Sequence, residues 1–123
     1  MILVDTSVWI SFLRKDDEDL VYILKRYLKK NDVYTVSAVF GELFQGVKNN
    51  REKSMLEVIW KSLPKPEEKD LFVQAGRLSN EHKLYAKGVG LIDCYLMAAC
   101  FANDLSLWTL DKKLQDAFEL LNE

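Results

Sequence analysis

The sequence contains few of the residues that stabilise secreted or membrane-bound chains. Cysteine occurs only at Cys94 and Cys100, both in one apolar stretch that is typical of a helix. Six residues along a helix span about 9 Å, which is too far for a disulfide within it. We therefore expect two buried thiols in a reducing compartment. No secretory signal precedes Asp5 and no apolar run approaches the ~20 residues of a membrane span, so we expect a cytoplasmic protein without membrane contact.

Positive charge and histidine are also scarce. Lys plus Arg total 17 and Asp plus Glu total 19, which gives a net charge of −2. Proteins that coat nucleic acid are strongly basic, so any nucleic-acid contact here must use a local patch or a bound cation. The single histidine, His82, lies in a polar helical stretch and is predicted to be a surface residue. No Ser–His–Asp set or Cys–His pair indicates a covalent nucleophile.

The order of apolar and polar segments predicts one α/β domain over residues 1–123, with a central, mostly parallel sheet. Strands are expected at 2–5, 33–37 and 105–110, and further candidates are a brief strand just before the breaking "PKP" at 64–66 and a closing strand at 118–121. Helices are expected at 7–14, 17–31, 38–47, 51–63, 67–86 and 91–104, and from residue 111. Ser37 is a candidate N-cap, and the almost wholly apolar segment 91–104 is predicted to be a central buried helix.

Four acidic residues have unusual neighbours. Most acids lie on polar helix faces, where we expect solvated side chains: Glu18, Glu52, Glu57, Glu67, Glu68 and Glu81. By contrast, Asp5 and Asp111 end strands, Glu42 lies among apolar residues, and Asp93 begins the most apolar helix. Each has a purely structural interpretation as well. Asp5 and Asp111 suit helix N-caps, and Asp93 suits the positive end of its helix.

The joint arrangement favours a shared site, because the carboxyl ends of parallel strands meet at one edge of a sheet. Four carboxylates there would repel, so at least one pKa should be raised unless a cation joins them. Hard divalent cations such as Mg²⁺ or Mn²⁺ take such oxygen ligands, and they can bind phosphate oxygens and acidify a bound water.

The segments "ILVDTSVWI", "FGELFQG", "GLIDCYLMAA" and "LWTLD" together resemble the PIN domain, and in particular the small toxins of the VapC type. The resemblance covers almost the whole chain. It implies a three-layer Rossmann-like fold and Mg²⁺- or Mn²⁺-dependent hydrolysis of RNA. By resemblance, Asp5, Glu42, Asp93 and Asp111 take the family's catalytic, metal-binding positions. Thr6 and Thr109 match hydroxyl residues that would support those carboxylates.

The same resemblance implies partners and leaves some residues open. It implies an RNA substrate, a small antitoxin protein and a homodimer. Lys112 and Leu114 depart from the residues that many relatives carry, and Lys112 could weaken metal binding by Asp111 or contact phosphate. Basic residues near the acids could guide RNA or simply form a solvated surface: Arg14, Lys15, Lys48, Lys87, Lys112 and Lys113. Trp9 and Trp108 are expected in the core rather than as platforms for bases.

Other functional classes match the sequence less well. A phosphotransfer receiver domain needs an acidic pair after its first strand, whereas this chain has the single acid of "DTS". A haloacid-dehalogenase-type phosphatase needs Asp-x-Asp there, and Ser7 occupies the second position. A non-catalytic PIN-fold module that binds RNA or protein is the alternative function, although none of the four acids is missing.

Overall fold

The structure is a computed structural model that describes residues 1–122. Its sheet has three short parallel strands in the order β2–β1–β3: β1 spans Ile2–Val4, β2 spans Val33–Tyr34 and β3 spans Ser106–Trp108. The central strand is therefore made from the start of the chain, and one of its neighbours comes from near the end. The predicted α/β fold with a parallel sheet is confirmed.

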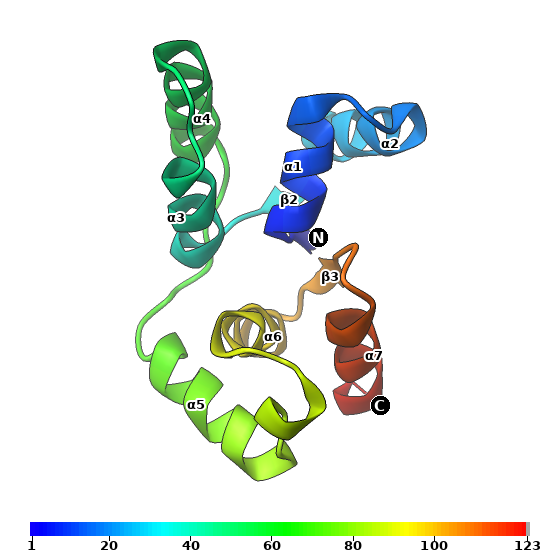
Figure 1. The fold of residues 1–123 in the computed structure, drawn as a ribbon, viewed down its shortest axis with the longest axis vertical. Helices are drawn as coiled ribbons and strands as arrows, with labels where there is room; N and C mark the ends of the chain where they lie inside the picture. Colours follow the sequence, from blue (N-terminus) through cyan, green and yellow to red (C-terminus); the bar gives the residue numbers. More distant parts are fainter. Residues whose placement is uncertain (123) are drawn as a thin grey trace.

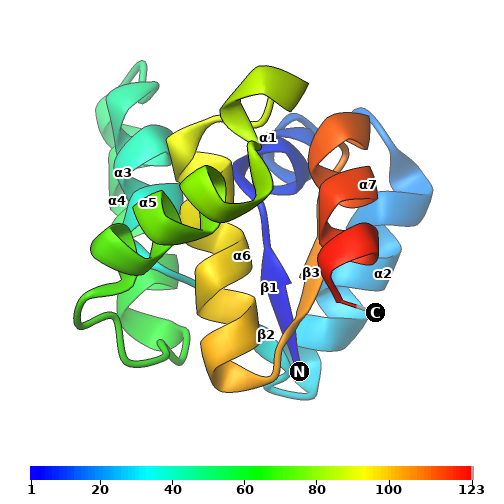
Figure 2. The same cartoon turned by 90° about the horizontal axis from the view of Figure 1, so that it is seen from below.

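Helices cover both faces of the sheet. Their bounds are α1 Thr6–Arg14, α2 Glu18–Lys29, α3 Ser37–Gln45, α4 Asn50–Ser62, α5 Leu71–His82, α6 Leu91–Asn103 and α7 Lys112–Leu121, with a 3₁₀ turn η1 at Tyr85–Lys87. Figure 1 shows α1 and α2 above the strands and α6 and α7 below them, with α5 outside α6 and with α3 and α4 along one side. Seen from below in Figure 2, α6 and α7 lie in front of β1 and β3, and α1 and α2 lie behind.

The helix α6 forms the middle of the core, as the sequence predicts. Its residues from Cys94 to Cys100 are all buried, and Trp9 and Phe40 add large side chains from the neighbouring helices. Both cysteines are free, and burial raises the pKa of the Cys100 thiol to about 12. None of the helices within residues 1–122 is long and apolar enough to cross a bilayer.

Two of the candidate strands are wrong. No strand forms just before 64–66, because α4 continues to Ser62, and the carbonyl of Pro64 accepts a hydrogen bond from the amide of Thr35 at 3.2 Å. Residues 118–121 continue α7, because Leu114, Ala117 and Phe118 share one buried face at helical spacing. The helix expected at 67–86 is also shorter, since the left-handed residues Asp70 and Lys83 bound α5.

Ser37 is not the N-cap of α3. It is the first residue of the helix, and Val36 occupies the N-cap position without a side-chain bond. The hydroxyl of Ser37 instead donates to Oε1 of Glu68 at 2.7 Å. The carboxylate of Glu68, 31 residues along the chain, therefore accepts the hydrogen bonds of the first residue of α3. The residues around Ser37 do not predict this partner.

Candidate active site at the carboxyl end of the sheet

Asp5 follows the central strand and is held by three donors. Its amide continues the pairing of β1 with β3 by donating to the carbonyl of Trp108 at 2.9 Å. The carboxylate, whose residue is 6% exposed, accepts from the Thr6 amide at 2.7 Å, the Ser7 hydroxyl at 2.9 Å and the Thr109 hydroxyl at 2.6 Å. Asp5 therefore does cap α1, and the same bonds hold its carboxylate in one orientation at the edge of the sheet.

Thr109 connects Asp5 with Asp111 across more than a hundred residues of chain. While its hydroxyl donates to Asp5, it accepts from the amide of Asp111 at 3.0 Å. The side chain of Asp111 caps α7, accepting from the amides of Lys113 at 2.9 Å and Leu114 at 3.3 Å. Thr109 is 8% exposed, whereas Asp111 is exposed. Two of the four predicted acids thus belong to one hydrogen-bonded network.

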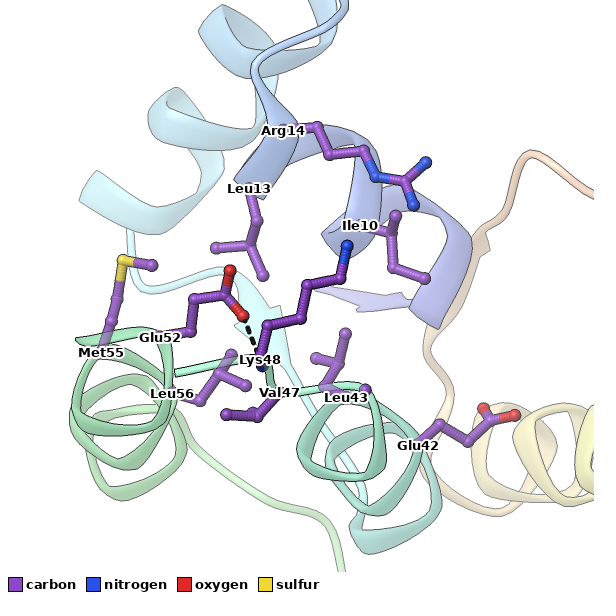
Figure 3. Close-up of a pocket in the computed structure, with 11 residues that line it drawn as sticks. Ile10, Leu13, Arg14, Glu42, Leu43, Val47, Lys48, Glu52, Met55 and Leu56 are labelled. Carbon is purple, nitrogen blue, oxygen red and sulfur yellow. Dashed lines mark hydrogen bonds between the residues drawn. The ribbon is translucent and has the colours of Figure 1, made fainter. Parts of the chain in front are cut away.

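Thr6 connects the first acid to the second. Its hydroxyl donates to Oε1 of Glu42 at 2.7 Å, which ties the start of α1 to the middle of α3. Glu42 is exposed, so this bond competes with water. In Figure 3, the Glu42 side chain points away from Leu43 and Val47 and toward α6.

Asp93 lies in the first turn of α6, and the pKa of its carboxyl is raised. Burial is the largest cause of its raised pKa, which is about 6 instead of 3.8. The negative charges of Asp5, Asp111 and Glu42 raise it further, and a hydrogen bond with the backbone of Gly90 opposes them. All three other acids therefore lie close enough to Asp93 to affect its ionisation.

The donor chemistry of this edge fits a hard divalent cation, because Mg²⁺ and Mn²⁺ prefer carboxylate oxygens and water. As they stand, no three His, Cys, Asp or Glu side chains in residues 1–122 are arranged as a metal site. The three other acids can still raise the pKa of Asp93, because charges act over longer distances than coordination bonds. Glu42 and Asp111 are exposed and can change rotamer, so ion binding would require their movement toward Asp5 and Asp93.

Several of the basic residues lie near this edge. Arg14 and Lys48 line a cavity of about 420 Å³ between α1, α3 and α4 that also includes Glu42 (Figure 3). The side chain of Lys113 lies over Gly88, where an added Cβ would come within 3.1 Å of its Nζ and where φ is +82°. Lys112 pairs with Asp116 at 3.5 Å on the exposed face of α7. Trp9 is fully buried and Trp108 is partly buried against the core, as predicted.

Two residues near the site were not identified from the sequence. Ser7, in the first turn of α1, donates to Asp5 and accepts from the amide of Leu110 at 3.0 Å. Like Thr109, it therefore joins the residues that follow β1 to those that follow β3. Its position in "DTS" beside Asp5 was the available signal. The expectation that Glu68 is a solvated residue on a helix is wrong. It lies in the segment that connects α4 to α5, is partly buried, and bonds to Ser37 and Tyr95.

Comparison with known proteins agrees with this architecture. The PIN domain family matches residues 2–119, and the chain belongs to this family. The proteins named Ribonuclease VapC32 from two strains of Mycobacterium tuberculosis, CDC 1551 / Oshkosh and ATCC 25618 / H37Rv, are each 31% identical over 120 residues, covering 95% of this chain and 90% of theirs. The crystal structure of FitAcB from Neisseria gonorrhoeae has the same fold, with a TM-score of 0.66, 21% identity and coverage of 97% of this chain and 94% of that one.

Proposed function

We propose that residues 1–123 form a single VapC-like domain that hydrolyses RNA phosphodiester bonds as a metal-dependent endoribonuclease. Membership of the PIN family and 31% identity to proteins named as ribonucleases support this function. The observation that carries the proposal is the coupling of four acids from distant parts of the chain: Asp93 is affected by Asp5, Glu42 and Asp111. Helix capping explains Asp5 and Asp111 separately, but it does not explain why four acids gather at one edge, where like charges destabilise each other.

The residues have distinct roles in this proposal. Asp5, Glu42, Asp93 and Asp111 would hold Mg²⁺ or Mn²⁺, which when bound neutralises phosphate charge and acidifies a water. Ser7 and Thr109 orient Asp5, and Thr6 orients Glu42, through the hydrogen bonds described above. Water would attack phosphorus in line with the 3′-oxygen, so that the P–O3′ bond breaks as the new P–O bond forms and the 3′-oxygen leaves with a proton. The products would carry a 5′-phosphate and a 3′-hydroxyl, and the 2′-hydroxyl of the RNA takes no part.

The test is cleavage of single-stranded or looped RNA by wild type and by Asp93→Asn, purified identically. We expect wild type to cut, EDTA to stop it, and Mg²⁺ or Mn²⁺ to restore it, while Asp93→Asn is inactive. Equal cleavage by both proteins would identify a contaminating nuclease or a different site. Products ending in a 2′,3′-cyclic phosphate would contradict attack by water.

The apolar cavity suggests where an inhibitor protein would bind. We propose a cytoplasmic homodimer that is neutralised by a small antitoxin, whose helix lies between α1, α3 and α4. This cavity is lined by Ile10, Leu13, Leu43, Val47, Met55 and Leu56. Arg14 and Lys48 at its border would favour acidic groups on the antitoxin (Figure 3). A monomer by light scattering would contradict the dimer, and a genome with no small reading frame beside this gene would count against the antitoxin.

A further inference from the structure

Glu68 joins three separate parts of the chain. It lies in the segment between α4 and α5, and its carboxylate accepts two bonds from the Ser37 amide at 3.1 and 3.2 Å. It also accepts from the Ser37 hydroxyl at 2.7 Å and from the hydroxyl of Tyr95. One carboxylate therefore binds the first residue of α3 and the second turn of α6.

These two helices carry two of the four acids. Glu42 lies five residues after Ser37 on α3, and Asp93 lies two residues before Tyr95 on α6. The helices pack against each other, so a tie between them limits both their separation and their relative rotation. Among the hydrogen bonds of residues 1–122, Glu42 joins the network that fixes Asp5 and Asp111 through Thr6, and no side-chain bond joins Asp93 to it.

The contacts of Tyr95 distinguish this arrangement from a simple helix cap. Capping α3 requires only that an oxygen accept from the Ser37 amide. Tyr95 is 7% exposed, and its ring packs edge-on against Phe72 at 5.8 Å between centroids, which fixes the direction of its hydroxyl. The hydroxyl therefore meets Glu68 from a rigid part of α6, and the carboxylate connects two elements instead of completing one.

We propose that Glu68 is a positioning residue for the acidic site: by bonding Ser37 and Tyr95 together it holds α3 and α6, and with them Glu42 and Asp93, at a fixed relative position. This inference rests on the metal-dependent function proposed above. In this proposal Glu68 acts through Ser37 and Tyr95 and not by direct contact with substrate or metal.

The first test measures Mn²⁺ binding from the electron paramagnetic resonance signal of free Mn²⁺. Tyr95→Phe keeps the ring and every charge but removes the hydroxyl, and Glu68→Gln replaces the carboxylate by one neutral acceptor. We expect each to weaken Mn²⁺ binding by about 3- to 10-fold, less than the loss of a direct partner of a ligand. The double variant should lose less than the product of the two effects, because both remove one connection.

Two control variants separate positioning from charge and from stability. Glu67→Gln removes a neighbouring charge that bonds only to the Lys69 amide among the contacts of residues 1–122. Asp17→Ala removes the N-cap of α2, which bonds the Leu20 amide at 3.1 Å on a helix that carries none of the four acids. Neither control should change Mn²⁺ affinity by more than about twofold. A Glu67→Gln effect equal to that of Glu68→Gln would overturn the proposal.

The second test does not depend on metal. Hydrogen exchange in the absence of Mn²⁺ reports opening of the first turn of α3. Tyr95→Phe, a change on α6, should speed exchange of the amides near Ser37, whereas Asp17→Ala should not. Unchanged exchange in Tyr95→Phe would overturn the connection even if Mn²⁺ binds. If Tyr95→Phe speeds exchange near Ser37 but the wild type binds no Mn²⁺, the connection through Glu68 stands and the proposed metal-dependent function is contradicted instead.

Discussion

The four acids are held in two different ways, and the division follows the sheet. Asp5 and Asp111 follow strands, and they share the hydroxyl of Thr109 at the paired ends of β1 and β3. Glu42 and Asp93 lie on α3 and α6, which the bonds of Thr6 and Glu68 tie to other elements. The sheet side is therefore positioned by backbone pairing, and the helix side by a few long-range side-chain bonds. The two halves of the site are therefore held by different kinds of contact.

The largest test of this contrast compares Asp5→Asn with Asp93→Asn. Both variants should lose RNA cleavage, but their stabilities should change in opposite directions at pH 7.5. Asp5→Asn replaces an acceptor of three bonds, so we expect a loss of about 1–3 kcal/mol in the free energy of unfolding. Asp93→Asn removes a charge that burial and three acids disfavour, so we expect a gain of about 1–2 kcal/mol after allowing for solvent screening. Urea unfolding without metal gives both values, and a loss in both variants would contradict the two-part description.

A second comparison uses the two threonines. Thr109→Val should cost about 2 kcal/mol and reduce cleavage by about 10- to 100-fold, because it leaves a buried oxygen of Asp5 and the amide of Asp111 without this partner. Thr6→Val should cost less than about 1 kcal/mol, since Glu42 is exposed and can bond to water instead. Thermal melts and single-turnover cleavage measure both effects. Thr109→Ser is the control, because it keeps the hydroxyl, and it should retain most of the activity.

The pH dependence of stability should isolate Asp93. Its pKa is raised to about 6 in the folded chain from the ordinary value of 3.8, so the unfolded chain ionises first as pH rises. The folded state therefore loses stability between about pH 4 and pH 6, and the full cost is present above pH 6. The advantage of Asp93→Asn should accordingly be absent below pH 4 and should grow to its full size by about pH 7. An advantage of equal size at pH 3.5 and pH 7 would contradict a cost of ionisation.

A bound divalent cation should remove the free-energy cost of ionised Asp93 in the folded chain. At about 100 times the dissociation constant, Mg²⁺ or Mn²⁺ should stabilise the wild type by about 2.7 kcal/mol and Asp93→Asn by much less. Thermal melts with and without Mn²⁺ measure the difference. A wild-type melting temperature that ignores both ions would favour the non-catalytic interaction module over the nuclease.

The smallest expected effect is at Lys112. Its pairing with Asp116 is exposed, so Lys112→Ala should change the free energy of unfolding by less than about 0.5 kcal/mol. If Lys112 contacts a phosphate, the variant should raise KM for RNA and leave kcat unchanged. If it opposes metal at Asp111, Mn²⁺ affinity should rise. No change in either quantity would make it an ordinary surface residue.

Local patterns predicted the parts of this fold that local chemistry determines. Three features could be recognised, because each depends on residues close in sequence or on the shared edge of a parallel sheet. They are the strand that leads into Asp5, the buried helix around Cys94 and the gathering of the acids. The segment 118–121 was ambiguous as a strand, since four residues suit either period, and only its packing beside Leu114 and Ala117 decides for a helix.

The long-range polar bonds were not predictable in the same way. Glu67 and Glu68 are adjacent acids in one charged segment, and nothing in their neighbours distinguishes them. Glu68 differs from Glu67 in its partners, because folding brings Glu68 beside the start of α3 and the side of α6. The catalytic and metal-binding roles of Asp5, Glu42, Asp93 and Asp111 stay predictions, as do the supporting roles of Thr6 and Thr109.

The pairing of β1 with β3 also affects when the protein becomes complete during its synthesis. Thr109, the hydrogen-bond partner of Asp5, is translated 104 residues after it, and the capping residue Asp111 follows Thr109. Until then Asp5 lacks one of its donors, and the edge of the sheet lacks its fourth acid. The nascent chain therefore carries no assembled acidic site until the segment from Asp5 to Asp111 has been translated. For a protein proposed to cut RNA, this order of assembly keeps the unfinished chain harmless to the message and ribosome that are producing it.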